Sequence, residues 1–198
     1  MNKQLFACII AVAAIAAAPT FAQAPQPVRG TIEKVDGSVL SIKEKDGSVV
    51  TVRLTDNAQV FGVVQAKVAD IKTGDFIGVG AMPQPDGSQK AIQVTIFAPS
   101  QRGLGEGFRP WDRPGSTMTN GSVDAVVEGV NGRVLTVKYK GGEQKIVIAE
   151  DATIRAYLPA EKSELKPGAR VAVTRPEKAP DGSLQTNRIN VGRNGAVP

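Results

Sequence analysis

The feature that most constrains the fold of this chain is an internal duplication. Residues 35–43 (VDGSVLSIK) recur 95 positions later as residues 130–138 (VNGRVLTVK). Ordered matches of this kind indicate a repeated structural unit, so the sequence predicts two copies of one unit of about 70 residues. Shorter matches follow in the same order: residues 70–74 with 164–168, and the tripeptide Asp-Gly-Ser at 86–88 with 181–183.

Each copy has the pattern of a series of half-buried β-strands. Apolar and polar residues alternate, as at Val50, Val52 and Leu54, and a period of two is typical of strands with one buried face. Dipeptides suited to tight hairpin turns lie between these stretches, which favours antiparallel connections. They are Asp36-Gly37, Asp46-Gly47, Asp86-Gly87, Asn131-Gly132, Gly141-Gly142 and Asp181-Gly182.

Each copy also contains one helix-like segment, residues 66–71 in the first and 160–165 in the second, with Gly74 and Gly168 following where a short helix would end. Three strands, a short helix and two strands is the element order of an OB-type barrel, and closing the sheet hides its edges. We therefore expect an all-β fold of two tandem small OB-like antiparallel β-barrels, each with one short helix.

The expected organisation has five parts. They are a signal peptide (1–22, or 1–24), a first barrel (26–97), a linker rich in Gly, Pro and Arg (98–118), a second barrel (119–192) and a C-terminal tail (193–198).

The N-terminus has the pattern of a secretory signal peptide. Lys3 supplies the positive charge, residues 5–18 are apolar and uncharged, and small residues follow up to Ala24. This run is shorter than the roughly 20 residues that span a membrane. We expect cleavage after Ala22 and a periplasmic or secreted product with no transmembrane segment. Residues 5–8 (LFAC) look like a lipobox, but cleavage there would leave too short an apolar region.

The absence of histidine removes whole classes of chemistry. The 198 residues include no His, and the single cysteine, Cys8, lies in the signal segment. Histidine-based nucleophile systems and His-ligated metal sites are therefore excluded, and loss of Cys8 removes disulfides and thiolate sites. We expect no enzymatic activity, no catalytic or metal-binding residues and no cofactor.

The linker carries the candidate binding residues. It holds the only tryptophan, Trp111, together with Arg102, Arg109 and Arg113. One interpretation is an anion site in which the guanidinium groups hold the ligand and Trp111 is an apolar or cation-π platform. The other is a wedge, in which Trp111 and Phe108 fill the seam between the barrels and Arg109 pairs with its neighbour Asp112.

The charge balance says little about partners. Lys and Arg number 24 against 19 Asp and Glu. OB barrels that bind single strands combine a basic groove with stacking aromatic residues, but aromatic residues make up 5% of this chain, so we expect no nucleic acid partner. No carboxylate cluster is recognisable, and several aspartates are expected to serve their own turns. They are Asp36, Asp46, Asp86 and Asp181.

The repeated core resembles an uncharacterised bacterial exported β-domain family, a domain of unknown function, in its duplicated form. The resemblance implies the fold and export, and no catalytic residue. Members are often labelled metal transporter permeases, which would need several spanning helices that this sequence does not show. Relatives often have His after Gly-Glu-Gly, where this chain has Phe108. The motifs are residues 30–32 (GTI), 35–38 (VDGS), 70–75 (DIKTGD), 86–88 (DGS), 105–107 (GEG), Trp111-Asp112, Pro114 and 118–120 (MTN).

These observations favour a non-enzymatic exported binding or accessory module. Its partner would be a small anionic ligand, an envelope polymer or another protein, contacted through the linker and the facing barrel surfaces. A cation-binding accessory of a metal transport system, built on clustered carboxylates, is an alternative. A hydrolase using two carboxylates about 5–10 Å apart is a further one.

Overall fold

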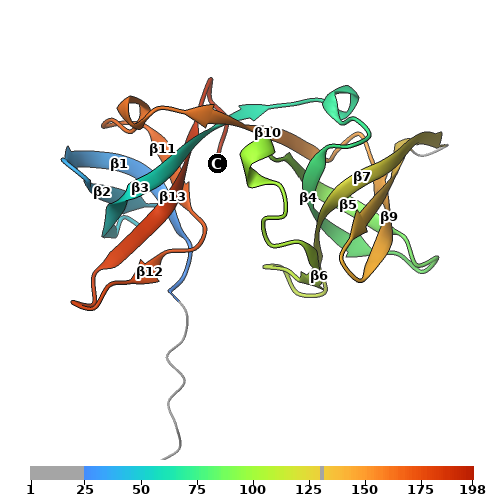
Figure 1. Ribbon diagram of the computed structural model, residues 1–198, viewed down its shortest axis with the longest axis horizontal. Helices are drawn as coiled ribbons and strands as arrows, with labels where there is room; N and C mark the ends of the chain where they lie inside the picture. Colours follow the sequence, from blue (N-terminus) through green and yellow to red (C-terminus); the bar gives the residue numbers. More distant parts are fainter. Residues whose placement is uncertain (1–24, 130–131) are drawn as a thin grey trace, which may run out of the picture.

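The structure is a computed structural model that describes residues 25–129 and 132–198 (Figure 1). The expected signal peptide and Cys8 lie outside the described residues. Most of the described residues lie in β-strands and the helical segments are single 3₁₀ turns, which confirms the all-β class. In the described part of the chain, no helix is long and apolar enough to cross a membrane. The strands are β1 (Val28–Asp36), β2 (Val39–Glu44), β3 (Val49–Gln65), β4 (Phe76–Pro83), β5 (Gln89–Ile96), β6 (Gly107–Pro110), β7 (Thr117–Gly129), β8 (Gly132–Tyr139), β9 (Gly142–Ile148), β10 (Thr153–Ala160), β11 (Arg170–Val173), β12 (Glu177–Lys178) and β13 (Leu184–Gly192).

The strands form two lobes, each around its own hydrophobic core. In the first lobe, β1, β2, part of β3, β11 and β13 surround a core that includes Leu40 and Ile189. In the second, β4, β5, β7, β8 and β9 surround a core that includes Ile77 and Leu135. Figure 1 shows the lobes side by side, joined across the top of the view by β3 and β10.

Strand pairing closes a ring of five strands in each lobe. The first ring runs β1–β2–β3–β13–β11 and back to β1, and the second runs β7–β8–β9–β5–β4 and back to β7. The β3–β13 and β5–β9 pairs are parallel and the other ring pairs are antiparallel. Each ring takes three strands from one copy and two from the other. The predicted tandem arrangement, in which 26–97 and 119–192 close separate barrels, is therefore not confirmed.

The length of β3 explains this exchange of strands between the two copies. At about 3.3 Å per residue, its 17 residues extend roughly 55 Å, longer than a strand of one small barrel. Its first half pairs with β2, and residues Val60–Gln65 pair antiparallel with Arg155–Ala160 of β10. The chain therefore leaves the first lobe along β3, builds the whole of the second lobe, and returns along β10.

The predicted short helices at 66–71 and 160–165 are not formed. Each segment contains a single 3₁₀ turn, η1 (Val68–Asp70) and η3 (Lys162–Glu164), and a third turn, η2 (Pro99–Gln101), lies in the linker. Because β3 and β10 continue to the edge of these segments, the remaining chain is too short to offset the cost of starting a helix. The segments instead bury Ile71 in the second core and Leu165 in the first.

Three of the predicted Asp-Gly turns, at Asp46, Asp86 and Asp181, share one geometry. In each turn the carboxylate Oδ1 accepts hydrogen bonds from the hydroxyl (2.6–2.7 Å) and the backbone N–H (2.9 Å) of the serine two residues on. These bonds lower the pKa of all three aspartates. The intervening glycines have φ between 82° and 89°, which side chains disfavour. The expected local role of these aspartates is confirmed.

A bidentate ion pair fastens the returning chain to the end of β13. Nε and Nη2 of Arg193 donate to the two carboxylate oxygens of Glu164 at 2.7 and 2.6 Å. The hydrogen bond from Arg193 lowers the pKa of Glu164 from 4.5 to about 2. Arg193 lies across Gly62 of β3, where a Cβ would collide with the guanidinium group. The pair therefore holds η3, β3 and the C-terminus together.

An engineered disulfide tests the exchange. Thr31 of β1 lies opposite Arg170 of β11, and opposed antiparallel residues have Cα atoms about 4.5–5.5 Å apart, within disulfide range. In a Cys8→Ser background, we expect Thr31→Cys/Arg170→Cys to form an intramolecular disulfide, seen as a loss of two free thiols by mass spectrometry. The control is Ser122→Cys/Arg170→Cys, which would link in a tandem arrangement, since Ser122 occupies the place of Thr31 in the second copy. A disulfide in the control but not in Thr31→Cys/Arg170→Cys would contradict the strand exchange between the copies.

The Glu164–Arg193 pair predicts a specific pH dependence. Folding lowers the pKa of Glu164. The contribution of the ion pair to the free energy of unfolding is therefore fully present above about pH 4.5 and is lost as the pH falls through about 2. We expect Glu164→Gln to lower the free energy of unfolding by about 1 kcal/mol at pH 7, as for a partly exposed bidentate pair. Denaturant titrations should show the two proteins converging as the pH approaches 2; a difference independent of pH would contradict this account.

Candidate functional site

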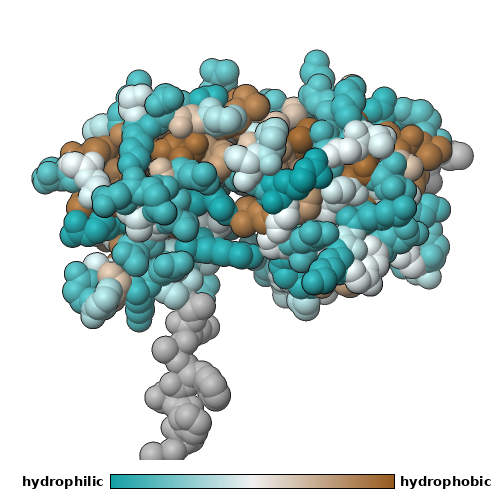
Figure 2. Space-filling model, viewed as in Figure 1, coloured by the Kyte–Doolittle hydropathy of each residue, from teal (hydrophilic) through white to brown (hydrophobic). Residues whose placement is uncertain are grey.

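The lobes face each other across a cleft of about 590 Å³, within the range of about 300–1,000 Å³ usual for small-molecule sites. β1, β13 and the segment from Thr174 to Glu177 after β11 contribute the wall of the first lobe, and β4, β5, β6 and β7 contribute that of the second. Tyr157 of β10 lies at the inner end, where its ring makes an edge contact with Phe97 (5.8 Å between centroids). Figure 2 shows mostly hydrophilic residues over the lower part of both lobes in that view.

Positive charge dominates the lining of the cleft. Two carboxylates are present, and one of them, Asp112, lies 3.8 Å from Arg29 in an exposed pair. The other, Glu177, is exposed. The excess of guanidinium groups makes the cleft a place of positive potential, because opposing walls concentrate the field of like charges. Its five arginines are Arg29, Arg109, Arg155, Arg175 and Arg188.

Arg109 and Arg175 approach each other from opposite lobes. Arg109 belongs to β6, and Arg175 follows β11. A β-carbon on Gly105 would lie 3.1 Å from Nη2 of Arg175 and 3.5 Å from Nη2 of Arg109, so both groups reach the same point. Nη1 of Arg109 donates to the carbonyl oxygen of Gly105 at 2.7 Å, which fixes its direction. Gly105 has a φ of 56° and leaves room for both side chains.

Arg188 of β13 joins these two guanidinium groups. The pKa values of Arg109 and Arg188 are both lowered, first because burial disfavours the charged form and second because the positive charge of Arg175 is near. Nε of Arg188 is buried and has no hydrogen-bond partner in the described part of the chain. Among the described residues, none of the three arginines forms a salt bridge. We call Arg109, Arg175 and Arg188 the arginine triad.

Arg155 has a different, structural setting at the inner end of the cleft. Its Nε donates to Oγ1 of Thr95 at 3.1 Å, and its Nη1 donates to the carbonyl oxygen of Val197 at 3.3 Å. Its guanidinium carbon lies 5.7 Å from the centroid of the Tyr157 ring, a cation-π distance. Burial raises the pKa of Tyr157. These contacts tie β5, β10 and the C-terminus together behind the triad.

The structure places two of the four predicted linker residues in the cleft. Arg109 belongs to the triad, and the ring of Trp111 lies on Gly80 of β4, leaving no room for a side chain there. Arg102 instead donates to the carbonyl oxygen of Gly74 at 2.6 Å and fastens the linker to the second lobe. Arg113 is exposed and does not line the cleft.

The wedge interpretation also predicted contacts that differ from those observed. Phe108 is 43% exposed and stacks on Tyr139 of β8, with 6.5 Å between ring centroids, so it does not fill the seam between the lobes. Asp112 lies near Arg29 rather than pairing with Arg109. The linker therefore covers one wall of the cleft and leaves the cleft open.

Sequence reasoning missed Arg29, Arg155, Arg175 and Arg188. These residues are distributed from position 29 to position 188 and meet only because the copies exchange strands. The available signal was the charge of each copy, because residues 28–97 have 8 basic and 8 acidic residues whereas residues 119–198 have 12 and 9. Such counts do not identify which side chains converge.

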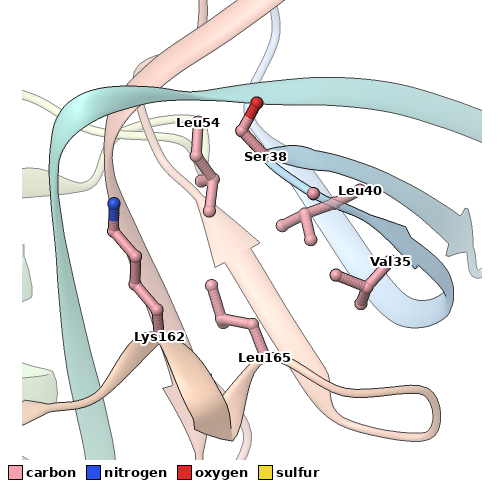
Figure 3. A pocket seen from close by; sticks show the side chains of 7 residues that line it. Val35, Ser38, Leu40, Leu54, Lys162 and Leu165 are labelled. Atoms are coloured by element: carbon pink, nitrogen blue, oxygen red, sulfur yellow. The ribbon is translucent and has the colours of Figure 1, made fainter.

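A second cavity, of about 270 Å³, lies at the end of the first lobe. Figure 3 shows Leu54, Leu40 and Val35 facing Lys162 and Leu165 across it. In the second lobe, the position of Ser38 is taken by Arg133, whose Nη1 donates to the carbonyl oxygen of Val68 and bridges the corresponding gap. The cavity is mainly apolar, and Nζ of Lys162 already donates to the carbonyl oxygen of Asp56 at 3.2 Å. It lacks the convergent charges of the cleft.

The described residues contain no cluster of carboxylates comparable to the cluster of arginines in the cleft. Within residues 25–129 and 132–198, no group of three or more Asp, Glu, His or Cys residues is placed to hold a metal ion. Comparison of the chain with protein-family models, curated proteins and solved structures gave no match. The arginine triad is therefore the main chemical feature from which a function can be argued.

Repulsion within the triad predicts a stabilising substitution. Arg175 is exposed, but its charge is close to the partly buried Arg109 and Arg188, so removing it should stabilise the protein when no anion is bound. We expect Arg175→Gln to raise the melting temperature by about 1–3 °C at low ionic strength, and the gain to disappear in about 1 M salt, where the screening length is about 3 Å. Arg113→Gln, in the same chain but outside the cleft, should leave the melting temperature unchanged. A lower melting temperature for Arg175→Gln would show that the triad is not repulsive.

Proposed function

We propose that the protein is a non-enzymatic exported binding or accessory module whose inter-lobe cleft binds an anionic ligand. The observation that carries this proposal is the arginine triad: three guanidinium groups converge with no carboxylate paired to them in the described structure. Export is supported by the signal-peptide pattern of the N-terminus. The ligand is a free anion or the charged group of an envelope polymer or protein.

The geometry of the triad suits multivalent oxyanions. A guanidinium group presents several N–H donors in a plane and matches carboxylate or phosphate oxygens two at a time. The triad holds one orphaned donor, Nε of Arg188, that is already removed from water. An anion bound there would gain charge-assisted hydrogen bonds and would relieve the repulsion between the guanidinium groups. Both effects favour the bound state.

The finer description of each lobe as an OB-like barrel forms part of the proposal. The order of pairing in both rings, with one parallel pair and four antiparallel pairs, supports it. If each lobe is an OB-like barrel, the strand exchange places the outer faces of the two barrels against each other. The linker then supplies Arg109 and Trp111 to the space between them.

Calorimetric titration with inorganic pyrophosphate tests the proposal. We expect saturable binding of one anion per chain at low ionic strength, weakening as salt is added. Arg175→Gln/Arg188→Gln should weaken binding by about 10–100-fold, the cost of losing hydrogen bonds to a charged group.

The matched control is Arg113→Gln, which removes the same charge from an exposed position outside the cleft. It should leave the affinity for pyrophosphate within about twofold of the unsubstituted protein, the shift expected of a screened distant charge. Equal losses in the control and the double variant would indicate non-specific attraction to a basic protein. Failure of pyrophosphate, phosphate and sulfate all to bind would overturn the proposal.

A further inference from the structure

Equivalent strand positions of the two lobes line the cleft, but they carry different side chains. Gly30 and Gly121 are equivalent, because each lies against the carbonyl oxygen of the matching lysine, Lys43 or Lys138. The residues before them, Arg29 and Asn120, therefore occupy the same place in the two lobes, and both line the cleft.

The same divergence occurs on the neighbouring strands. Counted from the repeated Asp-Gly-Ser, Arg188 of β13 corresponds to Gln93 of β5, and Asn190 corresponds to Thr95. All four line the cleft. At two equivalent positions the first lobe has arginine and the second has a neutral amide. We call Gln93, Thr95 and Asn120 of the second lobe the neutral wall; Arg109 of β6 is the cation that the linker adds beside it.

The neutral wall also carries the aromatic platform. Trp111 is packed on Gly80 of β4 in the second lobe, which fixes its ring beside the neutral residues. An aromatic face is electron-rich and attracts the slightly positive C–H groups of an apolar or sugar ring. Inorganic anions gain nothing from such a platform.

Two buried amides of the cleft have carbonyl oxygens without hydrogen-bond donors. Asn120 is 5% exposed and Asn190 is 2% exposed, and the Oδ1 atom of each is unpaired among the described residues. Nδ2 of Asn120 donates to the carbonyl oxygen of Leu104 at 2.9 Å, which leaves its Oδ1 as the free acceptor. A buried acceptor without a partner costs free energy. A ligand with hydroxyl groups satisfies these atoms directly or through a bridging water.

We propose that the ligand is an acidic saccharide, a sugar that carries a carboxylate, phosphate or sulfate group. Its anionic group lies at the arginine triad, its ring lies against Trp111, and its hydroxyl groups bond to the neutral wall. The cleft of about 590 Å³ lies in the range usual for small-molecule ligands. This inference rests on the anion site of the proposed function and adds the chemistry of the rest of the ligand.

Parallel titrations with tri-galacturonate, glucose 6-phosphate, glucose 6-sulfate, neutral maltotriose and inorganic phosphate test it. We expect at least one acidic sugar to bind tenfold or more tightly than both inorganic phosphate and maltotriose, and the preferred anionic group identifies the source. Trp111→Ala should weaken binding of that sugar about tenfold and leave inorganic phosphate unchanged. Arg188→Gln should weaken both, which separates the two halves of the site.

Because Trp111 also covers β4, Gln93→Leu is a second variant that removes a neutral hydrogen-bonding group without opening the packing. It should weaken only the acidic sugar, and the thermal unfolding of both variants shows whether they fold. If inorganic phosphate binds as tightly as every sugar, or both variants bind the preferred sugar normally, the saccharide assignment is wrong while the anion site stands. If no anion binds at all, the proposed function fails as well.

Discussion

The structure depends on the antiparallel crossing of β3 and β10. Six residue pairs, from Val60–Gln65 on one strand and Arg155–Ala160 on the other, join the lobes at this crossing. Aromatic packing supports it, since Phe97 contacts both Phe76 and Tyr157. Because the chain passes from lobe to lobe here, each core contains residues from both copies. The two lobes are therefore fixed in a face-to-face arrangement, and the cleft between them is a direct consequence of the crossing.

The crossing also explains why the same positions of both copies line the cleft. Each wall contains strands from both copies, so a difference between the copies at one position changes one wall alone. Arg29 in the first lobe corresponds to Asn120 in the second, and Arg188 in the first lobe corresponds to Gln93 in the second. The linker adds residues that the repeat does not supply, because Arg109 and Trp111 lie between the copies in sequence and in the cleft in space. An asymmetric site thus develops inside a nearly symmetric fold.

The period-two alternation and the Asp-Gly turns were enough to predict the β-class and three turn geometries, because both depend on neighbouring residues. The exchange was not predictable in the same way. In a duplicated sequence, a strand such as β4 finds the same partner pattern in its own copy and in the other, so local pattern cannot choose between them. Arg109 and Trp111 stood out because the linker concentrates unusual residues, whereas Arg175 and Arg188 become part of a site only after the exchange is known.

The arginine triad is stable only in the context of the rest of the fold. Burial and mutual repulsion both disfavour the charged forms of Arg109 and Arg188, and elsewhere in the protein such groups are satisfied locally, as Arg193 is by Glu164. The crossing, the two cores and the bidentate pair supply the stability that the cleft does not. Charges held together at a cost in the free protein are prepared for an opposite charge, since binding recovers the free energy that folding lost there. Among the described residues no carboxylate forms a salt bridge with the triad, and the proposed anion site accounts for this arrangement.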